Sequence, residues 1–238
     1  MAKMYGINGV ITGKLGAAVY AVRNGEQISR QYQPVVANPS TPAQLEARAK
    51  LKLLSQMSAV MAPVIAIPRR GAMSSRNLFL KRNYSLATYS ANQADVTLQS
   101  VQLTESVVAL GAFQSVRRDA EKIVASLNPS SVEGAINRVV YALFAKMSDN
   151  SLEFAGSTVV SAPGVANTWE ATLPLRNEEV VIYAYGIRDN TEAAKAKFGN
   201  LEAETAESVA KLLVSSVLTS SDVTLTKTIG TTINAAGE

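Results

Sequence analysis

Apolar and polar residues alternate in two short runs near the start of the chain. The runs cover residues 17–23 (AAVYAVR) and 26–32 (EQISRQY), and they flank Asn24 and Gly25. An Asn-Gly pair tolerates the positive φ angles that a tight type I′ turn requires. The pattern therefore predicts a β-hairpin. Two strands alone are marginally stable in water, so we expect this hairpin to pack on another part of the chain or on another subunit.

Glycines punctuate the residues before the hairpin, at positions 6, 9, 13 and 16. This density is typical of an arm that has no core of its own, or of backbone that lies close against another surface. The spacing does not match a phosphate-binding loop, because no G-x-x-x-x-G-K-[ST] run is present.

After the hairpin, apolar residues recur with the period of an α-helix. Thr41 is placed to cap a helix, Pro42 suits its first turn, and Gln44 would complete a capping box. The pattern predicts a helix over about residues 42–61, and a second helix that begins at Ser74 or Ser75. The expected apolar stripe of the first helix consists of Leu45, Ala49, Leu53, Leu54, Met57 and Met61.

Strand patterns dominate the chain from about residue 95. Residues 96–104 alternate as a half-buried strand does, and residues 222–233 would form a closing strand. Four further strand-like runs, separated by turn residues, cover 137–147, 151–161, 167–175 and 178–189. Their spacing is typical of an antiparallel sandwich. The predicted fold is α+β: an N-terminal β-hairpin and helices, then an antiparallel Ig-like β-sandwich with an added helix near 203–217.

Charge divides the chain in the same place. Residues 1–90 carry twelve Lys or Arg and two acids, a net charge of +10, whereas the remainder carries eleven and seventeen, a net charge of −6. We therefore predict two regions, a basic hairpin and helical region over 1–92 and an acidic sandwich domain over 93–238. The basic region could face phosphates, or the acidic region of an adjacent identical subunit.

Composition excludes much catalytic chemistry. The chain has no Cys and no His, so triads, Cys-His dyads and the usual zinc sites are impossible. We expect no catalytic residues, no metal, no cofactor and no small-molecule substrate. An enzyme would have to rely on carboxylates such as Glu178, Glu179, Glu204 and Glu207, and it would need a pocket that joins two of them. Neither a signal peptide nor a membrane span is expected.

Two groups of residues are candidates for binding a partner. The hairpin offers a subunit interface made of Val19, Tyr20, Val22, Arg23, Ile28, Arg30 and Tyr32. A basic cluster offers contact with nucleic acid or with an acidic partner, and it consists of Arg69, Arg70, Arg76, Lys81 and Arg82. No RNA-recognition or helix-turn-helix signature accompanies this cluster.

The first 80 residues also carry a recognisable signature. Gly13, Lys14 and Gly16 precede the hairpin, and the helix start reads N-P-x-T-x-A-Q at Asn38, Pro39, Thr41, Ala43 and Gln44. This block resembles an uncharacterised protein family of Bacteroidota and their phages, and it is most similar to versions from crAss-like gut phages. The run VRNGEQIS departs from the family, whose members often carry Trp or Lys before the turn. The resemblance implies a virion component of the portal-proximal tail or capsid.

The leading hypothesis is accordingly a phage virion structural protein, a multi-copy ring subunit of the connector or tail that is assembled in the host cytoplasm. Its expected partners are further copies of the chain, neighbouring virion proteins such as the portal or other tail rings, and packaged DNA, but no membrane. One alternative is an auxiliary capsid protein, and another is a nucleic-acid-binding protein that uses the basic N-terminal half.

Overall fold

The computed structural model describes residues 3–5, 10–23, 25–35, 40–68, 73–128, 136–148, 151–161, 169–199, 205–215, 218–219 and 221–234. The chain forms two compact units, residues 1–44 (unit 1) and residues 45–238 (unit 2). The predicted boundary at residue 92 rested on charge and stays a prediction about functional regions. The compact units instead divide between Gln44 and Leu45, because both long helices contribute side chains to the core of unit 2.

Unit 1 is a four-stranded antiparallel sheet. Its order is β1 (Lys3–Tyr5), β2 (Val10–Leu15), β3 (Ala18–Arg23) and β4 (Glu26–Gln31). The predicted hairpin is confirmed as β3 and β4, whose register runs from the pair Ala18 and Gln31 to the pair Arg23 and Glu26. Gly25 has a φ of +86°, as the turn requires, whereas Asn24 lies outside the described residues. The glycine-rich segment supplies the two additional strands β1 and β2.

Two helices follow, α1 (Pro42–Val60) and α2 (Ser75–Asn83). Both match the predicted positions, and the Ser74 hydroxyl caps α2 by accepting from the Asn77 N–H at 3.3 Å. The apolar stripe of α1 is buried at Leu54 and Met57, but Leu45 is 41% exposed because the first turns of the helix lie outside the core. The predicted capping box is absent: Gln44 Oε1 has no partner among the described residues.

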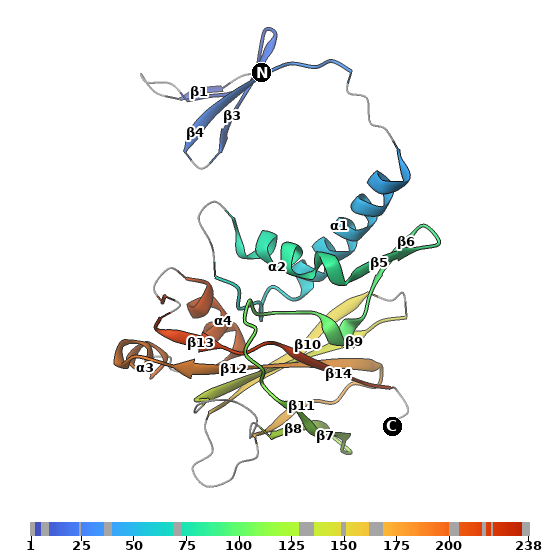
Figure 1. The fold of residues 1–238 in the computed structure, drawn as a ribbon, viewed down its shortest axis with the longest axis vertical. Helices are drawn as coiled ribbons and strands as arrows, with labels where there is room; N and C mark the ends of the chain where they lie inside the picture. The colour runs from blue at the N-terminus through green and yellow to red at the C-terminus, as the bar shows by residue number, and fades with distance from the viewer. Residues whose placement is uncertain are drawn as a thin grey trace. The chain divides into compact units, whose positions relative to one another are not determined.

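Unit 2 is built in layers (Figure 1). The central sheet has the order β10 (Leu152–Ser161), β9 (Arg138–Lys146), β12 (Glu179–Asp189), with β13 (Val223–Leu225) and β14 (Ile229–Ile233) both paired to β12. A second sheet has the order β11 (Trp169–Pro174), β8 (Lys122–Asn128), β7 (Ala112–Arg118). A separate hairpin joins β5 (Ala87–Ser90) to β6 (Gln93–Val96), and short 3₁₀ turns lie at Tyr84–Leu86 (η1) and Leu98–Ser100 (η2).

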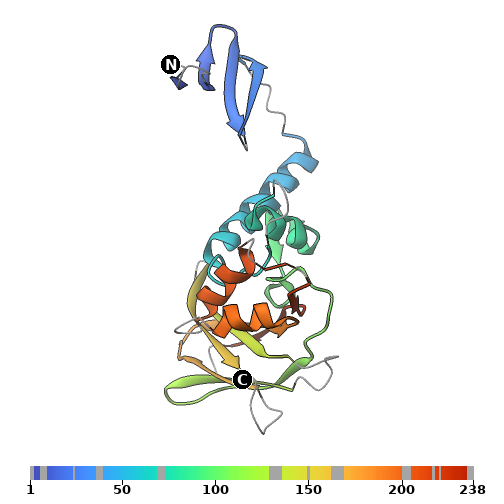
Figure 2. The same cartoon turned by 90° about the vertical axis from the view of Figure 1, so that its left-hand side faces the viewer.

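Strands β9 and β12 are buried on both faces. On one face Phe144 and Tyr183 pack in a cluster with α1, α2, α3 (Glu192–Gly199) and α4 (Ala206–Val214). On the other face Tyr141 and Leu143 pack against β8 and β11. Figure 2 shows α3 and α4 in front of the strands. Trp169, Tyr183 and Tyr185 belong to the core, since none is more than 4% exposed.

The fold class α+β is confirmed, but several predicted elements differ. Residues 96–104 are not a strand: only the end of β6 lies there, followed by η2 and irregular backbone. The closing strand is broken into β13 and β14 by Thr226–Thr228, whose hydroxyls serve hydrogen bonds instead. Helix α3 was not predicted; it forms because Ala194 and Phe198 meet the core four residues apart. Strand β7 was not predicted.

A buried polar network fixes the irregular segment 97–104. The Asn83 side chain donates from Nδ2 to the carbonyls of Phe79 and Gln102, each at 3.0 Å, and accepts the Gln102 N–H at 2.8 Å. Thr228 and Thr104 continue the network, with the Leu103 N–H donating to Thr228 Oγ1 and Thr104 Oγ1 donating to the Thr226 carbonyl. Side chains therefore supply the hydrogen bonds of this segment, whereas the backbone of a neighbouring strand would supply them in a sheet.

Within the described part of the chain, no helix combines the length and apolar character that crossing a membrane would need.

Candidate functional site

The sheet of unit 1 has no interior among its described side chains. None of the described residues between 11 and 35 is buried, and every residue of β4 is exposed. Large apolar side chains stand open to solvent, with exposed fractions of 54% for Leu15, 40% for Val22, 44% for Ile28 and 39% for Tyr32. An isolated sheet of this kind lacks the burial that stabilises independent domains.

The register divides the predicted subunit interface between two faces. Cross-strand partners lie on the same face, so Tyr20 and Val22 share one face with Leu15. Val19, Ile28, Arg30 and Tyr32 lie on the other, together with Lys14 and the register position of Arg23. On this second face the Lys14 ammonium lies 3.5 Å from the centre of the Tyr32 ring, a cation–π contact. The seven predicted residues are thus divided between two surfaces. The first surface is apolar, and the second carries both apolar and basic residues.

The predicted basic cluster is only partly described. Arg69 and Arg70 lie outside the described residues. Arg76, Lys81 and Arg82 belong to α2, where an advance of about 100° per residue spreads them about 100–140° apart around the axis. Arg76 donates to Ser55 and Ser58 of α1, and Arg82 donates to the Ser106 carbonyl. The three described cations therefore do not form one patch, and two of them also serve packing within unit 2.

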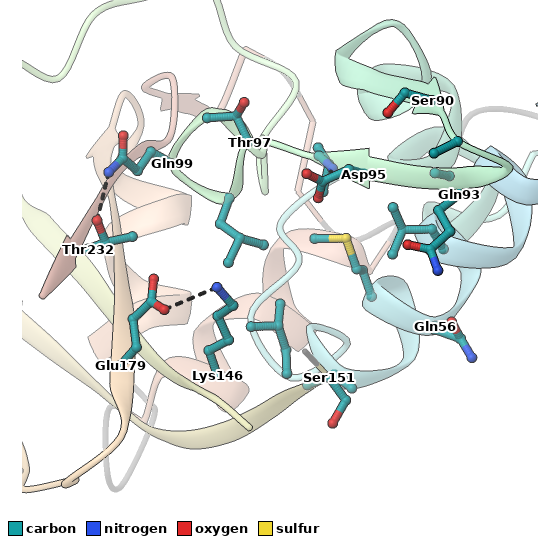
Figure 3. A pocket seen from close by; sticks show the side chains of 18 residues that line it. Gln56, Ser90, Gln93, Asp95, Thr97, Gln99, Lys146, Ser151, Glu179 and Thr232 are labelled. Carbon is teal, nitrogen blue, oxygen red and sulfur yellow. Dashed lines mark hydrogen bonds and ion pairs between the residues drawn. The ribbon is translucent and has the colours of Figure 1, made fainter. Parts of the chain in front are cut away.

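A groove opens in unit 2 that no sequence motif announced. Its volume is about 970 Å³, and we call it the β6 groove (Figure 3). One wall is the run from Gln93 to Gln99 and the other includes Lys146, Ser151 and Glu179. The apolar floor comes from α1 through Leu53, Met57 and Val60. These segments are far apart in sequence, which is why residue spacing could not reveal the groove.

Charged groups of the β6 groove are engaged with neighbours. The Lys146 ammonium lies 3.0 Å from Glu179 Oε2, and both side chains are about one-third exposed. Asp95 Oδ1 accepts the Val96 N–H at 2.8 Å, and Gln99 Nε2 donates to Thr232 Oγ1 at 2.7 Å. Figure 3 shows Asp95 on the opposite side of the groove from the Lys146–Glu179 pair. Asp95 and Glu179 thus line the same groove, each bonded to another group, whereas Glu204, another carboxylate named from the sequence, lies outside the described residues.

Two buried tyrosines of β12, Tyr183 and Tyr185, stay protonated over a wide pH range. Tyr183 donates its hydroxyl to the Leu98 carbonyl at 2.7 Å, and burial raises its pKa well above the ordinary value. Tyr185 donates to the Val64 carbonyl at 3.2 Å, and burial raises its pKa in the same direction. The Tyr183 hydroxyl thus holds Leu98, which lines the groove, and both hydroxyls are uncharged near neutral pH. Among the described residues no three carboxylates gather as metal ligands would.

A second groove has a volume of about 700 Å³. It is lined by two cations that are far apart in the sequence. Arg82 of α2 and Lys227 of the link between β13 and β14 both line it, together with Gln99 and Ser100. Gln102, only 7% exposed, also lines it, and its Oε1 has no hydrogen-bond partner among the described residues. We call this the Arg82 groove. Sequence reasoning found Arg82 but missed Lys227, which is separated from it by most of unit 2.

Comparisons with protein-family models, with curated proteins and with solved structures found no match to this chain. The resemblance to a family of crAss-like phages therefore stays a prediction.

Proposed function

We propose that this chain is a phage virion structural protein, a multi-copy ring subunit of the portal-proximal connector or tail. One observation carries the proposal: the sheet of unit 1 exposes Leu15, Val22, Ile28 and Tyr32 and has no buried side chain among its described residues after position 10. Such a sheet needs a partner to cover it. The resemblance to proteins of crAss-like phages supplies the setting, a virion assembled in the host cytoplasm.

In this proposal the partners are other copies of the chain and the virion proteins next to them, such as the portal or other tail rings. A ring repeats one head-to-tail contact, so a surface on one copy meets a different surface on the next copy. Residues 1–44 supply four basic residues against one acid, whereas the chain beyond residue 90 is acidic. Opposite charges on the two contact surfaces would favour this arrangement and suppress self-pairing of unit 1.

The proposal also includes a finer description of the fold, an Ig-like sandwich formed by the central sheet and the β7–β8–β11 sheet. Support comes from their shared buried cluster, in which Trp169 of β11 and Tyr141 of β9 take part. Tyr141 donates its hydroxyl to the Trp169 carbonyl at 2.6 Å, which ties the two sheets together.

The test is to image the purified protein and to count its symmetry by electron microscopy, with mass spectrometry of phage particles alongside. We expect the purified protein to form closed rings. In phage particles we expect the few copies that one ring contains. A chain that stays monomeric at high concentration and is absent from particles would refute the proposal. An auxiliary capsid protein would instead be present in hundreds of copies, so the same measurement separates these two functions.

A second candidate function is binding to packaged DNA, and the Arg82 groove favours it. Arg82 and Lys227 line one hollow with the polar side chains of Gln99 and Ser100, a combination that suits a phosphate backbone. The experiment compares DNA retention by the parent chain and by an Arg82→Gln/Lys227→Gln variant at low and at physiological salt. We expect retention to fall steeply with salt and to drop in the variant. Equal retention by both chains would exclude this function for the groove.

A further inference from the structure

The β6 groove exposes an unpaired strand edge. Strand β6 pairs with β5 alone among the described strands. Every residue from Gln93 to Gln99 lines the groove, whereas one face of a strand would contribute only alternate residues. The edge of the strand, with its backbone groups, therefore forms this wall.

The hairpin geometry shows which backbone groups point outward. Ala91 and Asn92, with φ of 48° and 62°, form the two-residue turn, so Ser90 and Gln93 are the hydrogen-bonded closing pair. Hydrogen-bonded pairs alternate along an antiparallel ladder. The N–H and C=O of Ala94 and the C=O of Val96 consequently point away from β5, toward the groove. The Val96 N–H is already bonded to Asp95 Oδ1.

Unit 1 carries a second unpaired edge, on β4. The Tyr32 N–H donates to the Ala17 carbonyl at 2.7 Å. By the same alternation, Gln27, Ser29 and Gln31 direct their backbone groups outward, and no other described strand pairs with β4. All six residues of β4 are exposed, and β4 is the last strand of the unit 1 sheet.

The two edges complement one another in chemistry. The β6 groove has an apolar floor and holds Asp95 and Glu179 against one Lys146. The second face of the unit 1 sheet offers Ile28 and Tyr32 with Arg30 between them, all on one side of the chain. The apolar side chains fit the floor formed by Leu53, Met57 and Val60, and the guanidinium of Arg30 suits a groove with an excess of carboxylate.

We infer that the β6 groove of one copy accepts strand β4 of a second copy, which adds to β6 by strand augmentation. The inference rests on the proposed function, because it identifies the surface to which unit 1 binds in the ring. It assigns a role to the exposed face of unit 1 and to the open edge of β6 at once. Each copy would give a strand to one neighbour and receive one from the other, which is a head-to-tail contact.

The test uses the absence of cysteine from the chain. Full-length Ser29→Cys and Gln93→Cys chains are co-expressed and treated with a short bismaleimide that bridges two thiols without a fixed register; each chain carries a single thiol, so a link between the two positions joins two copies. Both positions are exposed, so neither substitution disturbs a core. The matched control pairs Ser29→Cys with Gln114→Cys, an exposed position on β7 in the other sheet of unit 2. Linked peptides are identified by mass spectrometry.

We expect a mixed crosslink between the Ser29→Cys and Gln93→Cys chains that is lost in the control. Rings without this crosslink would overturn the inference and leave the proposed function standing. A crosslink confined to single chains, in a Ser29→Cys/Gln93→Cys double variant that stays monomeric, would also overturn it, because the groove would then hold the chain's own strand. A parent chain that forms no multi-copy assembly at all would refute the proposed function and the inference together.

Discussion

The Asn83 side chain should be among the most costly polar groups to remove from unit 2. It is fully buried at the end of α2 and makes three hydrogen bonds, two of them to the backbone of Gln102. In an Asn83→Ala variant the N–H and C=O of Gln102 lose these partners inside the protein. The Phe79 carbonyl lies in the helix and is less affected.

The expected cost follows from these counts. A buried polar group that loses its partner costs about 1–3 kcal/mol. Two such groups at Gln102 give roughly 2–6 kcal/mol, and water entering the space left by the amide favours the lower half of that range. We therefore expect the free energy of unfolding to fall by about 3 kcal/mol. This is a large part of the 5–15 kcal/mol that typical domains possess.

Urea denaturation followed by circular dichroism measures the loss, with the slope of the transition checked for each variant. Asn77→Ala is the matched control, because Asn77 is on the same helix and exposed. We expect the control to change stability by less than about 0.5 kcal/mol. If Asn83→Ala cost no more than Asn77→Ala, the network would not hold the segment 97–104, and this reasoning would be wrong.

Three further predictions concern unit 2. Ala91 has a φ of 48° at the β5–β6 turn, a backbone conformation that is strained for alanine but not for glycine. Ala91→Gly should therefore raise the free energy of unfolding by up to about 1 kcal/mol in the same urea assay. A lower free energy of unfolding in the variant would contradict this strain. A Cβ on Gly230 would lie 2.7 Å from the Gln99 carbonyl oxygen, whereas one on Gly199 meets nothing within 4 Å; Gly230→Ala should cost about 1–3 kcal/mol and Gly199→Ala very little. Burial raises the pKa of Tyr141, Tyr183 and Tyr185 above the ordinary 10.0. Each tyrosine therefore stays protonated in the folded state, and its contribution is complete below pH 10 and lost as the pH rises beyond it. The loss amounts to about 1.4 kcal/mol per tyrosine between pH 9 and pH 11, and a urea midpoint that is the same at pH 9 and pH 11 would contradict it.

Local signals accounted for the elements that the sequence could predict. Asn24-Gly25 predicted the register of β3 and β4 because few other pairs accept the turn's backbone angles. Ser74 marked the start of α2 because its hydroxyl satisfies an N–H that the helix leaves free. Strand β11 was predictable because Trp169, Ala171 and Leu173 alternate with exposed residues.

Strands β9 and β12 were predicted at their positions, although they are continuous apolar runs rather than alternating ones, because helices cover one face of the sheet and a second sheet covers the other. Tertiary context decided the elements that the sequence missed. Residues 96–104 alternate like a strand, yet their backbone groups bond to the side chains of Asn83 and Thr228. The turn at Ala91 has no glycine, so nothing in its composition announced the β5–β6 hairpin.

The candidate site, like the fold, was predictable from the sequence only in part. The sequence predicted a binding surface on the hairpin, which stays a prediction, and the register separates Tyr20 and Val22 from Ile28, Arg30 and Tyr32. It could not identify the β6 groove, because Asp95, Lys146 and Glu179 come from three distant segments. For the same reason Arg82 was grouped with its sequence neighbours, when its partner in the second groove is Lys227.

In the proposed function, another copy of the chain covers the sheet of unit 1. Hydrogen–deuterium exchange of the full-length protein, measured in dilute monomer and in the concentrated assembly, tests this contact. We expect the amides of β3 and β4 to exchange rapidly in the monomer and to become protected in the assembly. The buried strands β9 and β12 serve as an internal reference, protected in both samples. Equal protection of β3 and β4 in the monomer and in the assembly would contradict the claim.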